Sequence, residues 1–295
     1  MKRILAALLA VFTLLSLAAC SSEGKDALNN EKKAATKITE ELNAEVYRLL
    51  DFNDKQEGEF ANRGFITAPD SLVIKTENGA PVWSQDAYDF VRGDKEAPAE
   101  ANPGLWRNTQ YNALYGLFKV TDDIYQVRGY DISNITFVRS RNGWIIMDCG
   151  SSKYTASEAL KLFRSEMGDA RIVAIIISHA HVDHYGGIEG LISAENVADS
   201  KLPLDEQIAS GKTAIIVPQG FANAVMSENV FVGTAMKRRA FFQYGSMLPY
   251  DEKGRLSVGI GLTAVQNGVG YIAPSYEVTE SVCEMTIDGV KAVFQ

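Results

Sequence analysis

All three histidines of this 295-residue chain lie within six positions. They are His179, His181 and His184, and together with Asp183 they form the pattern H-x-H-x-D-H. Histidine is the commonest metal ligand among side chains, so a chain that has it nowhere else points to a metal site here. The apolar run at residues 172–177 comes directly before the motif and predicts a buried strand that ends where the motif begins.

The spacing of the motif predicts a site for divalent cations. His179 and His181 are two residues apart, so in an extended segment they project together, and Asp183 and His184 follow as the chain turns. The pair Gly186-Gly187 permits the tight backbone that such a turn needs. Imidazole and carboxylate ligands suit zinc best, with manganese and iron as alternatives. The competing interpretation is a polar turn that happens to contain three histidines.

This ligand set predicts metal-dependent hydrolysis. Two cations about 3.5–4 Å apart can share a water molecule and hold a charged substrate. A metal-bound water has a pKa near ~7, so a metal-bound hydroxide is the predicted nucleophile. We therefore predict His179, His181, Asp183 and His184 as metal ligands, with Asp183 also taking part in activating the water.

Asp148 is a second candidate residue. It follows the apolar run at residues 144–147, which predicts a strand, and comes before Cys149-Gly150. A carboxylate at this place can accept a hydrogen bond from a ligand histidine and orient its ring. A simple turn residue at the end of a strand is an equally good interpretation of the pattern.

The charge of the chain argues against a nucleic-acid partner. The formal net charge is −8, and no block of basic residues occurs after residue 3. Phosphate binding needs clustered Lys and Arg, which this sequence lacks. The length allows one large domain or two small ones.

The N-terminus predicts export. Lys2 and Arg3 precede an apolar run at residues 4–17, which is too short to span a bilayer comfortably, and the run ends in Ala19-Cys20. This order resembles a bacterial lipoprotein signal peptide, residues 1–20, in which Cys20 is lipidated and attaches the chain to a membrane. Because no acidic residue follows Cys20 directly, we expect an outer-membrane anchor facing the periplasm. The alternative is an ordinary secretory signal that leaves a periplasmic protein.

The sequence does not show whether the two further cysteines, Cys149 and Cys283, form a disulfide or are free thiols. They can pair in an oxidising compartment, although spacing alone does not show it. Two buried thiols are the other interpretation.

The order of predicted elements indicates a mixed α/β fold. Residues 21–58 read as a tether and an N-terminal helix at 31–50, followed by a polar loop, and residues 59–295 read as the main domain. Hairpins are predicted at 72–83, 117–127, 135–147 and 282–294, strands at 172–177 and 214–217, helices at 156–167, 186–193 and 222–244, and a loop at 249–274. The helical stretch 222–244 is expected to break near Asn229 and Gly233. Hairpins followed by strand–helix alternation predict a sheet with helices on one face.

Residues 178–187 resemble the H-x-H-x-D-H signature of the metallo-β-lactamase fold superfamily. Asp148 stands where that superfamily usually has an aspartate. The resemblance implies an αββα sandwich, of which this chain is expected to hold only a part because it stops partway through the domain.

A narrower resemblance extends along most of the chain, to alkyl sulfatases of the dodecyl sulfate hydrolase type. It is carried by residues 106–108, 116–120, 124–131, 227–230, 236–239, 244–245 and 287–290. It implies two zinc ions and hydrolysis of an alkyl sulfate ester to alcohol and inorganic sulfate. It also implies about twice this length, with two glutamates, a further histidine and a dimerisation region beyond residue 295. A homodimer is thus expected only if that region is present.

Two other functions remain open at this point. One is a truncated, inactive lipoprotein fragment with a remnant metal site, and the other is a different hydrolase of the same superfamily. A substrate contact is suggested by residues 231–244, where Arg238, Arg239 and Tyr244 stand among aromatic residues and could meet an anionic head and an alkyl chain. The alternative for this segment is an amphipathic helix that packs on the core.

Overall fold

The computed structural model describes residues 33–265 and 267–295. Contacts divide the chain into Met1–Thr36 and Lys37–Gln295, and the fold below is that of the second part. The predicted signal peptide, Cys20 and most of the predicted tether lie outside the described residues. Within the described part, no helix has the length and apolar character needed to cross a bilayer.

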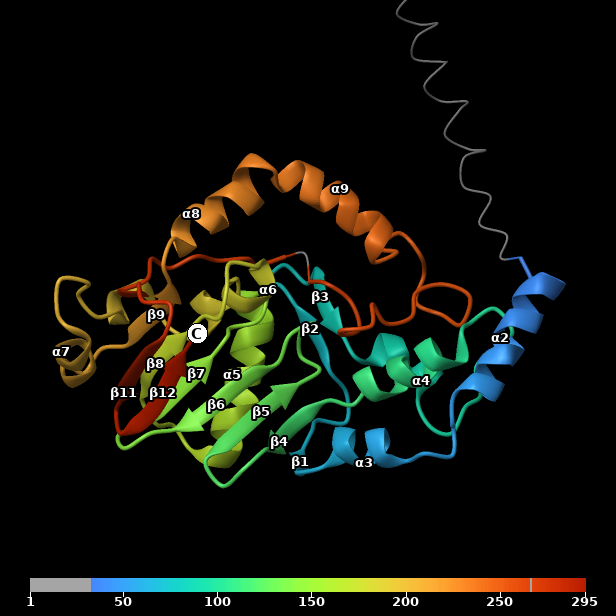
Figure 1. Ribbon diagram of the computed structural model, residues 1–295, viewed down its shortest axis with the longest axis horizontal. Coiled ribbons are helices and arrows are strands. Elements are labelled where there is room, and N and C mark those ends of the chain that lie inside the picture. The colour runs from blue at the N-terminus through green and yellow to red at the C-terminus, as the bar shows by residue number, and fades with distance from the viewer. Residues whose placement is uncertain (1–32, 266) are drawn as a thin grey trace, which may run out of the picture. The chain divides into compact units, whose positions relative to one another are not determined.

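An eight-stranded sheet forms the centre of the fold (Figure 1). Its order is β1 (Phe65–Thr67), β4 (Gly116–Lys119), β5 (Ile124–Arg128), β6 (Ile135–Arg139), β7 (Trp144–Met147), β8 (Ile172–Ile176), β9 (Ala214–Pro218) and β10 (Tyr276–Val278). The strands from β1 to β7 pair antiparallel, as hairpins do. From β7 to β10 the pairing is parallel, beginning with the connection from β7 to β8 through helix α5 (Lys153–Met167).

Alternation along the strands gives the sheet two buried faces. Ile146 and Ile175 belong to the larger core with α5, whereas their neighbours Ile145 and Ala174 belong to a smaller cluster on the other face. Successive side chains of a strand point to opposite faces, so a continuous apolar run is the pattern of a strand covered on both sides.

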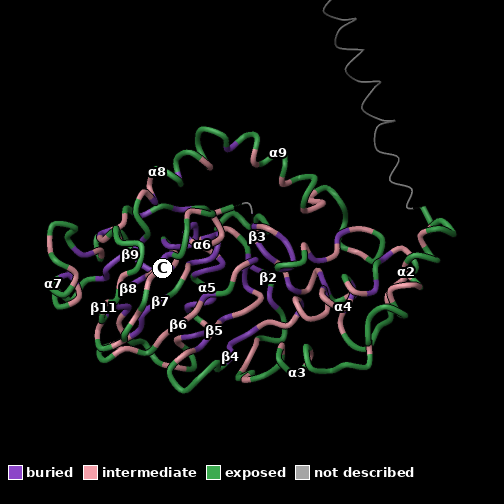
Figure 2. Tube along the Cα trace, in the orientation of Figure 1, coloured by how far each residue is buried: buried purple, intermediate pink, exposed green. Residues whose placement is uncertain are grey.

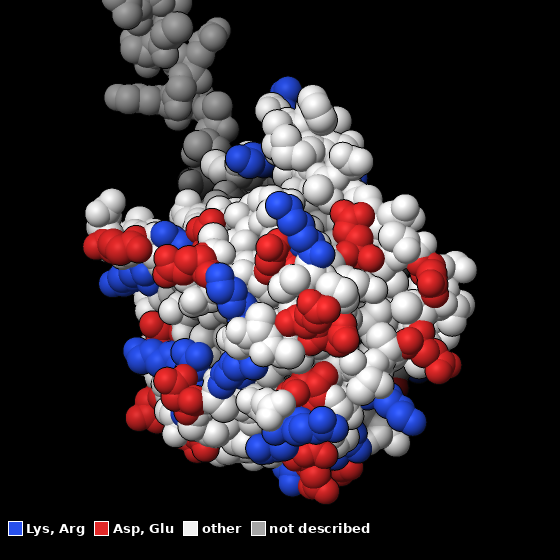
Figure 3. All heavy atoms as spheres, turned by 90° about the vertical axis from the view of Figure 1, so that its left-hand side faces the viewer, with Lys and Arg blue, Asp and Glu red and all other residues white. Residues whose placement is uncertain are grey.

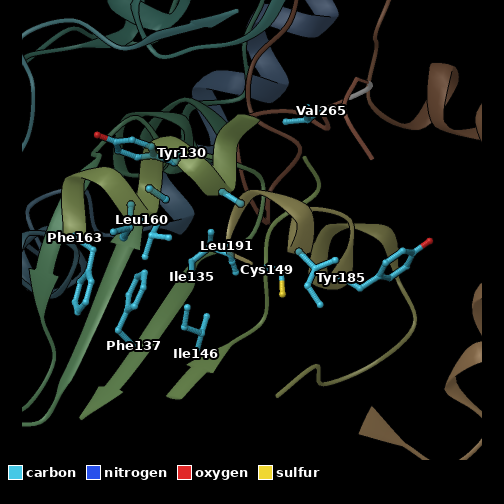
Figure 4. Packing of buried hydrophobic residues seen from close by; sticks show 14 of the residues in the cluster. Tyr130, Ile135, Phe137, Ile146, Cys149, Leu160, Phe163, Tyr185, Leu191 and Val265 are labelled. Atoms are coloured by element: carbon cyan, nitrogen blue, oxygen red, sulfur yellow. The ribbon is translucent and has the colours of Figure 1, made fainter. Parts of the chain in front are cut away.

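The larger core is rich in aromatic residues. Phe137 of β6 stacks on Phe163 of α5 with ring centroids 3.8 Å apart, and Trp144 meets Phe163 edge to face at 4.9 Å. Figure 4 shows this cluster continuing from Phe163 and Phe137 past Ile146 to Cys149 and to Tyr185, which directly follows His184 in sequence. A large apolar side chain contributes about 1.5–3 kcal/mol when fully buried, so the core that holds α5 also holds the end of the motif.

The other face is covered by a hairpin of β11 (Cys283–Ile287) and β12 (Val290–Phe294). Ile287 is fully buried against the sheet. The hairpin turn is tied to the turn between β6 and β7, because Asp288 accepts hydrogen bonds from Ser140 Oγ and from the backbone N–H of Asn142, both at 2.7 Å. A cavity of about 570 Å³ remains between this hairpin and the sheet.

The predicted hairpins and the α5 region are observed with shifts of a few residues, and a small hairpin pairs β2 (Val73–Lys75) with β3 (Pro81–Ser84). The predicted helix at 31–50 begins later, as α2 (Lys37–Leu49). Apolar residues recur at helical spacing along it, but the face they form is not covered: Ile38 is 70% exposed and Leu42 is 65% exposed. The pattern thus predicted a helix there but not what its apolar stripe contacts.

Some elements were missed. The loop expected after residue 50 contains α3 (Gln56–Asn62) and β1, and the stretches left unassigned hold η1 (Asp86–Val91), α4 (Pro103–Asn112), η3 (Ala194–Asn196), α7 (Leu204–Ala209) and β10. For α4 a signal was present. The Asn102 side chain accepts hydrogen bonds from the N–H groups of Gly104 and Leu105, and Pro103 takes the first position of the helix.

The predicted helix at 186–193 is only a short turn, η2 (Ile188–Gly190). The helical stretch 222–244 breaks as expected, into α8 (Phe221–Met226), the π-helical turn η4 (Ser227–Phe231) and α9 (Gly233–Gln243). These three form an arch that is exposed along most of its length (Figure 2). Phe231 is 81% exposed and Phe242 is 91% exposed, so for these two residues the interpretation of a helix packed on the core is wrong.

Charges are mixed over the surface that Figure 3 shows. Basic and acidic side chains are interspersed there, and no continuous patch of Lys and Arg forms on that face. The absence of a nucleic-acid partner stays a prediction. The cysteines are unpaired within the described residues: Cys149 is fully buried, which raises the pKa of its thiol, and Cys283 is half-buried.

Candidate metal centre

The motif lies at the edge of the sheet where the parallel strands end. Asp148 directly follows β7, and residues 177–181 follow β8 and lead into the four-residue helix α6 (Val182–Tyr185). Because β7 and β8 are parallel neighbours, their carboxyl ends meet at one edge, which is where open α/β sheets bind ligands.

The three histidine rings lie together at this edge. The ring of His179 is 4.6 Å from that of His181 and 4.0 Å from that of His184, measured between centroids. His181 occupies the position before the first residue of α6, with extended backbone angles. The turn into α6 therefore brings together the imidazoles that the sequence motif singled out.

His184 lies between two carboxylates. Its Nδ1 is 2.8 Å from Oδ2 of Asp148, and its Nε2 is 3.1 Å from Oδ2 of Asp183. Two ligand atoms at about 2.0–2.1 Å from one tetrahedral zinc ion lie roughly 3.3 Å apart. The separation of Nε2 from the Asp183 oxygen is thus close to that of two ligands of one ion, whereas Nδ1 faces an outer partner.

Asp148 has an unusual backbone. Its φ is +58°, one of two positive values among the described non-glycine residues. Its carboxylate accepts hydrogen bonds from the N–H of Ser178 at 2.8 Å and from Ser178 Oγ at 3.0 Å, besides the contact to His184. A left-handed residue costs about 1–3 kcal/mol and persists where its surroundings over-determine it. The strain here is offset by contacts that fix both the end of β8 and the ring of His184.

The electrostatics of the site couple its ionisable groups. Burial alone would lower the pKa of His184, but hydrogen bonds with Asp148 and Asp183 outweigh it and raise that pKa to about 10. Burial and the neighbouring His184 and His181 lower the pKa of His179. Burial acts to raise the pKa of Asp183, yet the hydrogen bond with His184 lowers it overall. A cation that binds Nε2 of His184 must therefore displace the proton that this nitrogen shares with Asp183.

Gly186 and Gly187 are needed for close approach rather than for unusual φ angles, since their φ values are −63° and −86°. A Cβ at Gly187 would lie 2.0 Å from the carbonyl oxygen of Cys149, and one at Gly186 would lie 2.4 Å from that of Ser151. The backbone of the motif thus packs closely against the backbone of the loop that follows β7.

Two carboxylates that sequence reasoning did not select stand at the same edge. Oε1 of Glu228, in η4, is 3.7 Å from Nε2 of His181. Glu280 comes two residues after β10 and lines the 570 Å³ cavity together with Ser178. In the sequence, Glu228 stands out only as part of residues 227–230, one of the segments that resemble alkyl sulfatases. Glu280 could have been selected from its position just after a strand of the parallel part of the sheet. That argument would have needed β10 to be predicted as a strand.

The donor set suits a metal in kind. Three imidazoles and the carboxylate of Asp183 are typical zinc ligands, with Asp148 as an outer acceptor. Among residues 33–265 and 267–295, however, no group of three or more His, Cys, Asp or Glu side chains converges closely enough to hold a metal ion as it stands. His184 contacts Asp183, and His181 contacts Glu228. These side chains must therefore rotate before their ligand atoms can meet at one metal ion.

The residues expected to contact substrate lie on the arch. Arg238 and Arg239 are exposed on α9, and Tyr244 ends it, half-buried. Arg238 lines a hollow of about 620 Å³ with Phe241, Phe242, Gly245, Met247 and Leu248. The arch residue that contacts the motif is Glu228, and no contact of these two arginines with the motif is seen among the described residues.

Comparison with known proteins gives consistent matches. Residues 128–220 match the metallo-beta-lactamase superfamily. The chain is 38% identical over 262 residues to a linear primary-alkylsulfatase of a Pseudomonas species, covering 89% of this chain and 37% of that protein. It is 39% identical over 258 residues to the alkyl/aryl-sulfatase BDS1 of Saccharomyces cerevisiae, covering 87% and 38%.

A solved structure agrees. The inverting sec-alkylsulfatase Pisa1 from a Pseudomonas species superposes with a TM-score of 0.81 at 37% identity, over 90% of this chain and 40% of that one. Residues 128–220 are thus similar to the metallo-β-lactamase superfamily, and the chain is similar over most of its length to alkylsulfatases. The predicted α/β fold and the predicted resemblance are thereby confirmed. The chain spans between 37% and 40% of the length of these relatives.

Proposed function

We propose that this chain carries the metal-binding part of a hydrolase that cleaves alkyl sulfate esters to alcohol and inorganic sulfate. The observation that supports this most is that the rings of His179, His181 and His184 lie side by side at the carboxyl edge of the sheet. It occurs in a chain that is 38% identical to an alkylsulfatase over 262 residues.

In this proposal His179, His181, Asp183 and His184 hold zinc. A bound divalent cation lowers the pKa of water and neutralises charge on a departing sulfate. Asp148 keeps Nδ1 of His184 occupied, which leaves Nε2 directed towards Asp183 and the site. The carboxylate of Asp183 would accept a hydrogen bond from the attacking water and orient it towards the ester.

Four ligands are few for two cations, since a tetrahedral zinc ion takes four by itself. We propose Glu280 as a further ligand, because it follows β10 at the same edge and lines the same cavity as Ser178. Glu228 is placed to assist at His181.

Replacing Glu280 with glutamine is therefore expected to weaken zinc affinity by about tenfold or more, because a charged ligand is lost. Zinc affinity would be measured by competition with a chromogenic chelator. Glu284→Gln is the matched control, since Glu284 is an exposed carboxylate on β11. Equal affinities for the two variants would contradict the role of Glu280.

For substrate, we propose that Arg238, Arg239 and Tyr244 meet the anionic ester and that the apolar lining of the neighbouring hollow receives part of the alkyl chain. Arg238 stands there beside Phe241 and Phe242, which combines a cation with apolar surface. This pairing fits an anionic head on a hydrocarbon chain better than a polar lactam.

A substrate panel tests the proposed function. We expect the protein to release inorganic sulfate from dodecyl sulfate, to lose this activity with a chelator and to regain it with zinc, while nitrocefin stays intact. Hydrolysis of nitrocefin without sulfate release would support another hydrolase of the superfamily. Metal binding without any turnover would contradict the enzymatic proposal.

A further inference from the structure

Asp131 has a buried carboxylate for which the proposed chemistry has no use. It lies between β5 and β6 and is only 4% exposed. Oδ1 accepts hydrogen bonds from the N–H of Ile132 at 2.8 Å and from Ser151 Oγ at 2.6 Å. Oδ2 accepts from the N–H of Ser151 at 2.9 Å and from Thr155 Oγ1 at 2.5 Å. All four donors are uncharged.

Such an arrangement is costly unless it fixes something. Removing a carboxylate from water costs several kcal/mol, and here burial raises the pKa of Asp131 although the hydrogen bonds from Ser151 and Thr155 oppose that shift. Two of the four hydrogen bonds go to Ser151, so the carboxylate holds both the backbone and the side chain of that residue. Ser151 belongs to the loop between β7 and α5.

That loop is hydrogen-bonded to the histidine motif. The N–H of Cys149 donates to the carbonyl of His184 at 2.8 Å, and the N–H of Gly187 donates to the carbonyl of Gly150 at 2.9 Å. Gly150 is the direct neighbour of Ser151 and has a φ of +71°. The loop, whose position depends on Asp131, is therefore hydrogen-bonded to His184 within α6 and to Gly187 just after it.

A second connection comes from the same segment. Ser133, two residues after Asp131, donates a hydrogen bond from its Oγ to the carbonyl of Asp183. Helix α6 has only four residues, and a single helical turn is not stable by itself. Its position must come from neighbours, and the segment 131–133 supplies both a direct and an indirect support.

We propose that Asp131 is a positioning residue that holds the metal-binding motif in place through Ser151 and the loop between β7 and α5, with Ser133 as its direct partner at Asp183. This gives a role to the segment 128–131, which the sequence marked only by resemblance. The inference rests on the proposed metal site for its consequence, because a functional site needs its ligands held to within about 0.5 Å.

Asp131→Asn is the informative substitution, and Asp288→Asn is its matched control. The asparagine is nearly the same size, but its NH₂ group would face donors from Ser151 and Thr155 at position 131. Asp288 also accepts from a serine hydroxyl and a backbone N–H, yet it does so in the hairpin turn on the other face of the sheet. Both variants lose charge-assisted hydrogen bonds, so general destabilisation affects both.

We would measure amide hydrogen exchange across the full chain and zinc affinity by chelator competition. Asp131→Asn is expected to speed exchange selectively in residues 178–187 and to weaken zinc binding about tenfold, in the range of outer-partner effects. Asp288→Asn is expected to change neither beyond its effect on global stability. Equal exchange in residues 178–187 for the two variants would overturn the proposal.

Ser133→Ala provides a test that does not depend on how well Asp131→Asn folds. It removes only the direct hydrogen bond to Asp183, and faster exchange confined to α6 is expected. Unchanged exchange there would count against the segment as a support. If the unaltered protein bound no zinc, the proposed function would fail, whereas the exchange data would still decide whether Asp131 positions the motif.

Discussion

Replacing His184 with alanine is expected to abolish zinc binding at the proposed site and to lower alkyl sulfate hydrolysis by well over ~100-fold. Loss of an outer hydrogen-bond partner already costs about 10–100-fold in metal affinity or activity, and His184 supplies the ligand atom itself. Its Nε2 lies 3.1 Å from Asp183, and its ring lies 4.0 Å from that of His179. Elemental analysis and sulfate release measure the two effects.

Asp148→Asn is the graded comparison for this experiment. Asparagine can still accept through its oxygen from Nδ1 of His184, so a loss of about 10–100-fold is expected rather than abolition. Circular dichroism should show that both variants keep the fold, because the carbonyl of His184 still accepts from Cys149. Unchanged zinc content in His184→Ala would refute the metal site.

Replacing Gly187 with alanine is expected to lower the free energy of unfolding by about 3 kcal/mol or more, at the upper end of overpacking effects. The new Cβ would lie 2.0 Å from the carbonyl oxygen of Cys149 and 2.8 Å from Cβ of Ala156. The carbonyl oxygen of Cys149 is a backbone atom, and Cys149 and Ala156 are both fully buried, so neither atom can move away easily. Thermal denaturation followed by circular dichroism checks the effect, and zinc affinity should fall with it.

Gly233→Ala is the control for that substitution. Gly233 begins α9, and a Cβ there would meet only the carbonyl oxygen of Glu228, at 4.0 Å. Alanine favours a helix more than glycine, so this variant should be neutral or slightly stabilising. Similar melting temperatures for the two variants would show that the contact between the motif and the loop after β7 is loose.

The sheet could be predicted where the local pattern and the tertiary environment agree. Ile145, Ile146, Ala174 and Ile175 form apolar runs that require cover on both faces, and the structure provides it through α5 and the β11–β12 hairpin. Strand β10 could not be predicted, because it has only three residues and its central residue, Glu277, is charged and exposed. Its pairing with β9 comes from the neighbouring strand, not from its own composition.

The apolar residues of α2 and of the arch show another limit. Spacing correctly predicted helices at Ile38–Leu42 and around Phe242, but burial depends on what stands opposite, and these side chains are exposed. Similarly, Glu228 carries no local signal, and it reaches His181 only because η4 passes beside the motif.

The candidate metal ligands and their order could be predicted from the sequence, since the H-x-H-x-D-H spacing follows a strand and its geometry is local. The folded structure adds which carboxylates surround them: Asp148 and Glu228 contact His184 and His181 from separate segments, and Glu280 lines the same cavity as Ser178. It also shows the hydrogen bonds from Ser133 to Asp183 and from Ser151 to Asp131 on which the proposed support of the motif rests. The physical reason is that hydrogen bonds and close packing act over a few ångströms in space, whatever the distance along the chain.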